Sequence, residues 1–214
     1  MKTTVKIALS VEGDTEKLYF DWLQEQINSD KSALKHIIID SKVNQSPSSR
    51  AKMLPNFSSN YPILAHVCDV ESKDDEHVTK FQNIITQLEE ARKRFDNYKF
   101  FYSNFTFDLW MILHKATCNG ALTHRKHYLD KINKAYKMDF ISLDTYKEKN
   151  QFAKCLSKLT LQDVRDAVQR AKQICKIYNQ NGNKFKNFKG IIYAEENPYL
   201  TVGDLVEYIL KLCY

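Results

Sequence analysis

Carboxylates stand at the ends of predicted strands, where they could bind a metal ion or a substrate. Glu12 comes directly after the apolar run 5–9 and directly before a helical pattern. In an open α/β sheet the carboxyl ends of the strands line the ligand crevice, so a side chain there is well placed for chemistry. Asp14 or Thr15 can cap the helix, and Glu16 either serves the site or simply complements the helix dipole.

A second pair of carboxylates ends a second predicted strand. Residues 62–68 form a short apolar run that leads into Asp69 and Glu71. Because side chains alternate along a strand, both acids point to the same side if the strand continues through Val70. Mg²⁺ prefers oxygen ligands, keeps several waters and usually takes only one or two protein carboxylates. The pair is therefore a candidate Mg²⁺ or Mn²⁺ site, whereas residues 74–76 are expected to form a solvated loop that caps the next helix.

A further acid follows an aromatic strand. Ser103 and Asn104 are good N-cap residues for a helix predicted over 105–117, and Asp108 is the only acid within that helix. Burying a bare carboxylate costs several kcal/mol, so Asp108 either faces a groove or has a partner. Compensation of the helix dipole is the alternative. We expect Asp108 to take part in the site, with Ser103 and Asn104 in support.

Positive charge is concentrated after residue 75. Residues 1–75 carry nine Lys/Arg against eleven Asp/Glu, and residues 76–214 carry 23 against 15. An acidic site beside a basic surface suits an enzyme that acts on a polyphosphate, because cations hold the backbone while carboxylates hold the metal. Lys147 is a candidate phosphate-binding residue, with plain helix surface as the alternative. The candidates for a nucleic-acid track, which could equally be solvated helix surface, are Arg165, Arg170, Lys172, Lys176, Lys184, Lys186 and Lys189.

Four segments together resemble the RloB-like proteins, a branch of the Toprim-fold nucleases. Residues 12–20 resemble the opening Glu-Gly-x-Thr-Glu-x-x-Tyr-Phe of that family, and 69–71 fall where it has Asp-x-Asp. Residues 103–114 are similar to its Ser-Asn-Pro-x-Phe-Glu-x-Trp-x-Leu-x-His signature, which is the most specific of the four. Residues 196–205 resemble its closing Asn-Pro-x-Thr segment. The resemblance thus spans nearly the whole chain in order.

Three positions depart from the family pattern. Glu71 replaces an Asp, Asp108 replaces a Glu and Phe105 replaces a Pro. Since Glu reaches one methylene further than Asp, the two acidic exchanges run in opposite directions. They could preserve a metal site with shifted ligands, or mark a site that has lost activity.

The resemblance implies a Toprim-like, Mg²⁺-dependent nuclease or phosphotransfer site, in a bacterial defence locus beside an ATPase of the ABC or AAA type. Glu12 would then be a general base or a ligand through water, Asp69 and Glu71 would hold the metal, and Asp108 would support the metal or its waters. DNA and RNA, including tRNA, stay open as substrates. The alternative is a non-catalytic regulatory or scaffold subunit that binds the ATPase.

The predicted fold class is α/β, with a Toprim-like parallel sheet flanked by helices and a mostly helical C-terminal half. Strands separated by helices imply parallel pairing with right-handed crossovers. We expect a core with the acidic site over 1–118 and a basic, helical subdomain over 119–214 packed on it. Strands are predicted at 4–11, 36–41, 62–69 and 98–103, and helices at 15–28, 76–96, 105–117, 122–137, 143–159, 161–180 and 201–212.

Composition agrees with a cytoplasmic protein. The 214 residues, 43% hydrophobic, are enough to bury a sizeable core. No stretch approaches the roughly 20 apolar residues of a membrane span, and residues 1–4 lead into a short strand and not into a signal peptide. The five scattered cysteines form no Cys-x-x-Cys pair and indicate reduced thiols. A homodimer is compatible with this composition.

Overall fold

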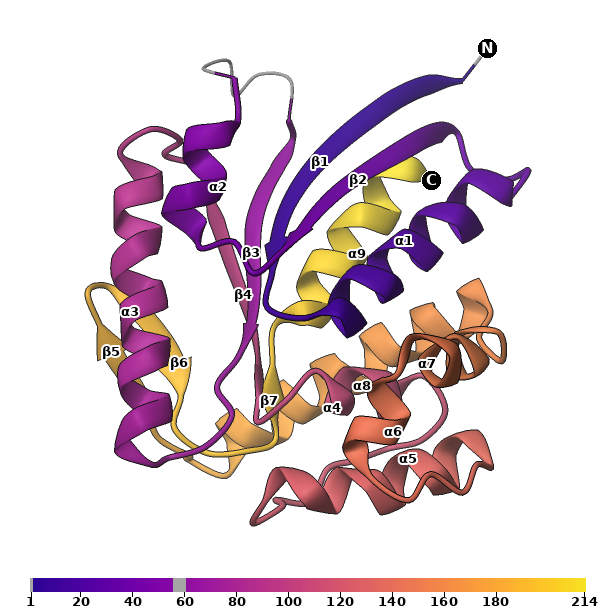
Figure 1. Cartoon of the computed structure of the whole chain (residues 1–214), viewed down its shortest axis with the longest axis vertical. Helices are drawn as coiled ribbons and strands as arrows, with labels where there is room; N and C mark the ends of the chain where they lie inside the picture. Colours follow the sequence, from indigo (N-terminus) through magenta and orange to yellow (C-terminus); the bar gives the residue numbers. More distant parts are fainter. Residues whose placement is uncertain (1, 56–60) are drawn as a thin grey trace.

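A five-stranded sheet forms the centre of the computed structural model, which describes residues 2–55 and 61–214 (Figure 1). The strand order is β2-β1-β3-β4-β7, and only β7 runs antiparallel to its neighbour. The four strands predicted from the sequence are confirmed to within two residues, and they pair in parallel as predicted. The strands are β1 (Thr3–Val11), β2 (Lys35–Val43), β3 (Ile63–Asp69), β4 (Lys99–Asn104) and β7 (Tyr199–Leu200).

Helices cover both faces of the sheet, as the predicted fold class requires. On one face lie α1 (Asp14–Ser29) and α9 (Val202–Cys213), and on the other lie α2 (Pro47–Met53) and α3 (Asp75–Arg92) (Figure 1). Alternation along β1 supplies both layers, because Ile7 and Leu9 belong to one apolar cluster while Ala8 belongs to another. The sheet therefore buries side chains on both faces, as parallel sheets commonly do.

The other helices pack below α1 and α9 in the view of Figure 1. They are α4 (Asp108–Leu113), α5 (Tyr128–Tyr136), α6 (Leu143–Lys147), α7 (Lys149–Leu156) and α8 (Leu161–Gln180). The bounds predicted for α8 are confirmed, and Thr160 begins it with a capping box to Asp163. The single helix predicted over 143–159 is wrong, because Glu148 leaves helical geometry and separates α6 from α7. The helix predicted over 122–137 begins only at Tyr128, after a 3-10 turn at Arg125–His127.

Three short strands in the C-terminal half were not predicted. Strands β5 (Phe185–Phe188) and β6 (Ile191–Ala194) form a hairpin, and β7 adds to the central sheet beside β4. The hairpin turns at Lys189 and Gly190, both with positive φ, which is the backbone geometry of a tight hairpin. Such a turn commonly contains Asn-Gly or Asp-Gly, so the Lys-Gly pair did not indicate a hairpin in the sequence.

Side-chain amides from α1 close the outer edge of the sheet at β2. Asn28 accepts a hydrogen bond from the backbone N–H of Ile37 (2.8 Å) and donates one to its carbonyl (2.9 Å). Gln24 accepts from the N–H of Ile39 (2.6 Å). These backbone groups would otherwise be open to a further strand, so the contacts protect the edge against pairing with another chain.

Within residues 2–55 and 61–214 no helix is both long and apolar enough to cross a membrane. All five cysteines carry free thiols, as expected from their spacing.

Candidate functional site

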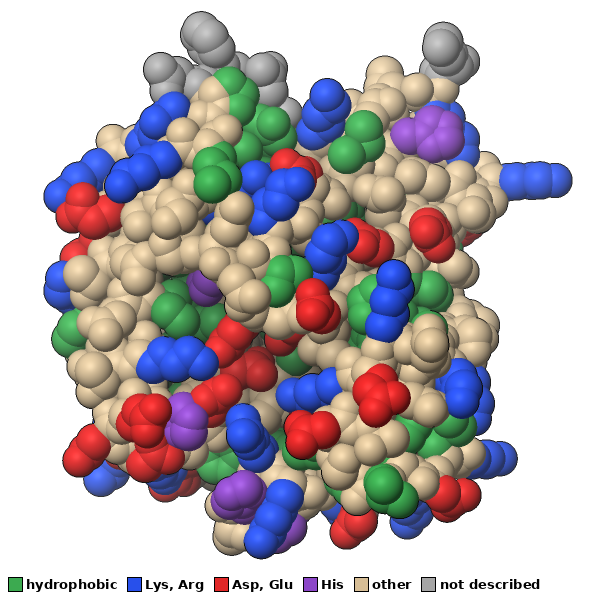
Figure 2. Space-filling view, in the orientation of Figure 1, with side chains coloured by type: hydrophobic (Ala, Val, Ile, Leu, Met, Phe, Trp, Pro, Cys, Tyr) green, Lys and Arg blue, Asp and Glu red, His purple; other side chains and the backbone are tan. Residues whose placement is uncertain are grey.

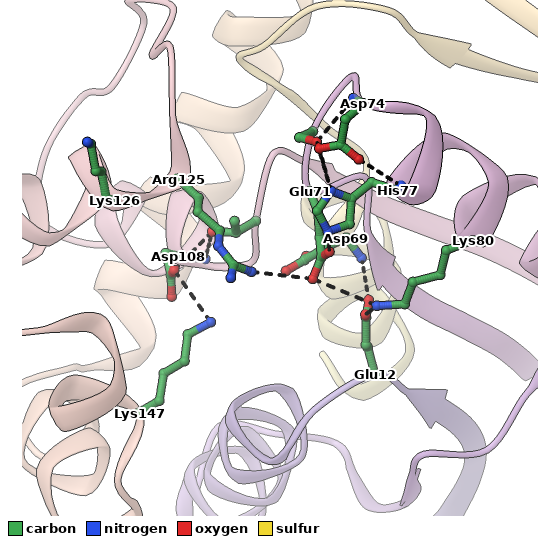
Figure 3. A network of polar contacts seen from close by, with 12 residues as sticks. Glu12, Asp69, Glu71, Asp74, His77, Lys80, Asp108, Arg125, Lys126 and Lys147 are labelled. Atoms are coloured by element: carbon green, nitrogen blue, oxygen red, sulfur yellow. Dashed lines mark hydrogen bonds and ion pairs between the residues drawn. The ribbon is translucent and has the colours of Figure 1, made fainter.

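Glu12 and Asp69 meet at the tips of adjacent parallel strands. Strands β1 and β3 pair up to Val11 and Val67, which places the residues that follow them side by side. The backbone N–H of Asp69 donates a hydrogen bond to Glu12 Oε2 (3.0 Å; Figure 3). The two acids that were singled out on different strands are thus joined directly, at the carboxyl edge of the sheet where ligands bind in open α/β folds.

Glu16 folds back toward this pair and is almost fully buried, with 4% of the residue exposed. The cap predicted at Asp14 or Thr15 is wrong, because Gly13 is the N-cap of α1 and no side chain caps the helix. A Cβ at residue 13 would lie 2.9 Å from Glu16 Oε2, so glycine leaves the space that this carboxyl occupies. The Thr15 hydroxyl donates to the same oxygen (3.0 Å). Glu16 is therefore more than a solvated residue of the first turn.

Three carboxyl groups crowd this place, and their electrostatics reflect it. Burial raises the pKa of Asp69 well above its usual value, and the neighbouring Glu16 and Glu12 carboxylates raise it further. Burial also raises the pKa of Glu16, with an added contribution from Glu12. Like charges in a desolvated site oppose ionisation, and a cation placed among them would relieve that repulsion.

Glu71 lies beside this group but is oriented differently from the prediction. Strand β3 ends at Asp69, and Glu71 has a left-handed φ of 62°, so strand alternation does not carry Glu71 to the side of Asp69. The carbonyl of Phe105 accepts its backbone N–H (2.8 Å). Its carboxylate Oε2 lies 2.5 Å from His77 Nε2, and its Oε1 lies 3.6 Å from Arg125 Nη1.

Lys80 places an ammonium group between Glu12 and Glu71. Its Nζ lies 2.6 Å from Glu12 Oε1 and 3.8 Å from Glu71 Oε1 (Figure 3). Partial burial alone would lower the pKa of Lys80, but the hydrogen bond and charge of Glu12 raise it above its usual value. The site therefore contains a position where a positive charge already rests between two carboxylates.

The buried carboxylate of Asp108 has side-chain partners, so it does more than compensate the dipole of its helix. Only 2% of the residue is exposed, and its carboxylate accepts a hydrogen bond from Thr106 Oγ1 (3.0 Å). Lys147 Nζ lies 3.8 Å from Asp108 Oδ2. The charges of Asp108, Asp69 and Glu16 raise the pKa of Lys147 against the opposite effect of burial. Lys147 is thereby brought to the acidic group (Figure 3), with 39% of its side chain still exposed.

Ser103 and Asn104 hold neighbouring segments of the site through hydrogen bonds. The N-cap predicted for them is wrong, because they end β4 and Phe107 is the N-cap of α4. The carbonyl of Ser103 accepts the N–H of Val70 (3.0 Å), which holds the segment that carries Glu71. Asn104 Nδ2 donates to the carbonyl of Ala194 (3.1 Å) and so ties the hairpin to the sheet.

Two other residues of the resembling segments are structural. The Tyr19 hydroxyl lies 3.1 Å from His114 Nε2, and His114 Nδ1 lies 2.9 Å from the carbonyl of Trp110. Tyr19 and His114 are buried, with 0% and 1% exposed. This contact joins α1 to α4, the helices whose first turns carry Glu16 and Asp108.

The seven cations proposed as a nucleic-acid track lie on α8 and around the hairpin, and five have local partners. Lys172 pairs with Glu207 (2.7 Å), Lys186 with Glu195 (3.3 Å) and Lys189 with Glu89 (2.8 Å). Arg170 donates to the carbonyls of Leu113 (2.5 Å) and His114 (3.0 Å), and Arg165 stacks on the ring of Tyr214 (5.0 Å). For Lys176 and Lys184 no ion pair is found in the described part of the chain. A role for this group in nucleic-acid binding stays a prediction.

Sequence reasoning missed the basic side chains that border the acidic group. His77 and Lys80 come from the first turns of α3, and Arg125 comes from the 3-10 turn before α5. Figure 2 shows the result, with acidic side chains gathered in the middle of this face and Lys and Arg side chains around them. The position of His77 and Lys80 in a helix that directly follows acidic residues was the sequence feature that could have placed them at the site.

The carboxylates at the strand tips suit a divalent cation that keeps most of its water ligands. Within residues 2–55 and 61–214, no three His, Cys, Asp or Glu side chains already converge as a metal cage. Mg²⁺ itself usually needs only one or two protein carboxylates and fills its other positions with water or substrate oxygens. Glu12 and Asp69 meet that need, and the ammonium of Lys80 marks a cation position beside Glu12. The residues therefore fit a water-rich Mg²⁺ or Mn²⁺ site.

The fold and the site define a mostly parallel α/β protein with a group of carboxylates at the strand tips. The profile of the RloB-like protein family matches residues 7–209, nearly the whole chain, so the protein belongs to the RloB-like family. No curated protein and no solved structure gives a significant match.

Proposed function

We propose that this RloB-like protein is a Toprim-type, metal-dependent phosphodiesterase that cuts DNA or RNA at the carboxylates of the strand tips. The observation that carries the proposal is the contact between Glu12 and Asp69, which makes one acidic group from two adjacent strands. Buried Glu16 adds to that group, and burial together with the Glu16 and Glu12 carboxylates raises the pKa of Asp69, an effect that a divalent cation would oppose. Mg²⁺ or Mn²⁺ held by Asp69 and Glu12, with Glu71 beside them, would lower the pKa of an attacking water and offset charge on phosphorus.

Each side chain of the site would have a separate role, which depends on its position. Glu12 would act either as a metal ligand through water or as the base that accepts a proton from the attacking water, because one of its oxygens faces the Lys80 ammonium and the other accepts from the Asp69 N–H. Lys147 would offset charge on a nonbridging phosphate oxygen. Asp108 would act as a positioning residue, since its buried carboxylate holds the Lys147 ammonium at the site.

The family resemblance supports a biological setting. We propose that the enzyme is the effector of a bacterial anti-phage or abortive-infection system and that it acts with an ATPase of the ABC or AAA type. Cleavage in the cytoplasm would then depend on that partner as well as on the metal. The resemblance alone supports the setting and the partner.

A specific observation favours a second candidate, a non-catalytic subunit of the ATPase complex. Glu71 is engaged by His77 at 2.5 Å and by Arg125 at 3.6 Å, and Lys80 takes an oxygen of Glu12. If these contacts persist in solution, Glu71 and Glu12 contribute to structure and are not free to bind a metal.

The two candidates are separated by one experiment on the purified chain. Plasmid DNA, single-stranded DNA and tRNA are incubated with the protein in Mg²⁺, in Mn²⁺ or in EDTA, with and without the proposed ABC- or AAA-type ATPase. Metal-dependent cleavage supports the nuclease. Stable binding to the ATPase with no cleavage in any combination supports the non-catalytic subunit.

A further inference from the structure

A pocket of about 320 Å³ opens between α1 and the junction of α6 and α7. It is lined by Asp14, Lys17, Leu18, Asp21, Lys147 and Lys149. The volume lies within the roughly 300–1,000 Å³ typical of small-ligand sites. Helices α1 and α7 pack against each other here (Figure 1), so well-ordered elements form the walls of the pocket.

The pocket is continuous with the acidic site through one side chain. Lys147 lines the pocket, and its ammonium lies 3.8 Å from Asp108 Oδ2. Asp14 lines the other wall, two residues after Glu12 and two before Glu16. A molecule that is bound in the pocket and contacts Lys147 would therefore lie one side chain away from the Asp108 carboxylate.

The charges of the lining residues suit a ligand that has both an anionic group and hydrogen-bond donors. Lys17 pairs with Asp21 at 2.5 Å, so these two charges offset each other. Lys149 has no ion pair within the described residues, and it begins α7 next to Glu148. Its ammonium is thus open to an anionic group, while the Asp14 carboxylate can accept from a sugar or a base. Leu18 supplies an apolar surface between them.

We propose that this pocket binds the nucleotide next to the scissile phosphate, with Lys149 and Lys147 contacting the phosphate backbone and Leu18 packing against the sugar or base. The inference rests on the proposed nuclease function and names the path of its substrate. The bound nucleic-acid strand would then run along the N-terminal end of α1. This path is separate from the predicted nucleic-acid track on α8, where most of the cations already have partners. Asp14 would accept hydrogen bonds from the same nucleotide.

The test compares two lysines of one helix. Lys149 lines the pocket, whereas Lys154, also exposed on α7, donates to Gln151 Oε1 (2.8 Å) away from it. Binding of fluorescein-labelled single-stranded DNA and RNA is measured by anisotropy in EDTA, over a range of salt concentrations, for the wild type and for Lys149→Gln and Lys154→Gln. Since each phosphate contact on a single strand contributes about 0.7 to the log–log salt slope, Lys149→Gln should lower the slope by about 0.7. Lys154→Gln should keep the slope of the wild type.

The proposal is overturned if the wild type does not bind, if Lys149→Gln keeps the slope of the wild type, or if both variants lose slope equally. Cleavage in Mg²⁺ is measured separately on the same proteins, with and without the proposed ABC- or AAA-type ATPase. A slope change confined to Lys149→Gln, with no cleavage by any protein, would support the pocket and contradict the nuclease. Cleavage with an unchanged slope would support the nuclease and contradict the pocket.

Discussion

The backbone N–H of Asp69 donates a hydrogen bond to the Glu12 carboxylate at 3.0 Å, and this contact joins the ends of β1 and β3. It fixes one oxygen of Glu12 and leaves the other to Lys80, at 2.6 Å. The Asp69 carboxylate itself stays close to Glu12 and Glu16 without a hydrogen bond to either within the described residues. This arrangement favours the binding of a cation among the carboxylates.

Replacing Asp69 by Asn should weaken metal binding without weakening the fold. The neutral amide removes one charge from a crowded group of carboxylates, so the melting temperature at pH 7.5 should equal or exceed that of the wild type. Calorimetric titration with Mn²⁺ should show a lost or greatly weakened site. A wild-type isotherm would remove Asp69 from the set of metal ligands, and a large drop in melting temperature would assign it a structural role.

Replacing Lys80 by Met should strengthen metal binding. The Lys80 ammonium competes for the Glu12 oxygen at 2.6 Å, and Met keeps most of the aliphatic stem while it removes the charge. The matched control is Lys93→Met, which removes an exposed lysine paired with Glu90 on the other end of the same helical region. The Kd for Mn²⁺ should fall in Lys80→Met and stay unchanged in the control. Weaker binding in Lys80→Met would show that the lysine supports the site.

His66 should make the protein sensitive to acid. Burial of this β3 side chain lowers its pKa from 6.5 to about 4, and its Nδ1 lies 2.7 Å from Ser10 Oγ. The unfolded chain therefore binds this proton more readily than the folded one, so the stability contributed by neutral His66 is complete above about pH 6.5 and is lost as the pH falls toward 4.

The pH effect can be measured by urea unfolding at several values between pH 7 and 4.5. The wild type should lose free energy of unfolding over this range, and His66→Asn should lose less. The control His36→Gln, at an exposed histidine on β2, should retain the pH dependence of the wild type. Equal slopes in His66→Asn and the wild type would contradict the assignment.

The sheet and its acidic edge could be predicted because their signals are local. The apolar runs that became β1 and β3 are each followed at once by an acid, so the parallel order of strands was enough to bring Glu12 and Asp69 to one edge. The 20 residues of α8 were equally predictable, because apolar positions recur at helical spacing between a capping Thr160 and Asn181.

The orientation of Glu71 and the ring of cations could not be predicted, because they depend on distant parts of the chain. The N–H of Glu71 bonds to the carbonyl of Phe105, and its carboxylate meets Arg125 more than fifty residues away. Strands of two to four residues, such as β7 and β5, carry too short a pattern to be distinguished from loop.

The most direct test of the central claim compares Glu12→Gln with the wild type in metal-dependent cleavage, with the proposed ATPase partner present. Gln retains an oxygen that can accept from the Asp69 N–H, so the free energy of unfolding should stay within about 1 kcal/mol. It removes the charge needed to take a proton or hold a cation. The control is Glu25→Gln, at an exposed position of α1. The account predicts cleavage in Mg²⁺ or Mn²⁺ by the wild type and the control and none by Glu12→Gln, whereas equal cleavage by all three would contradict it.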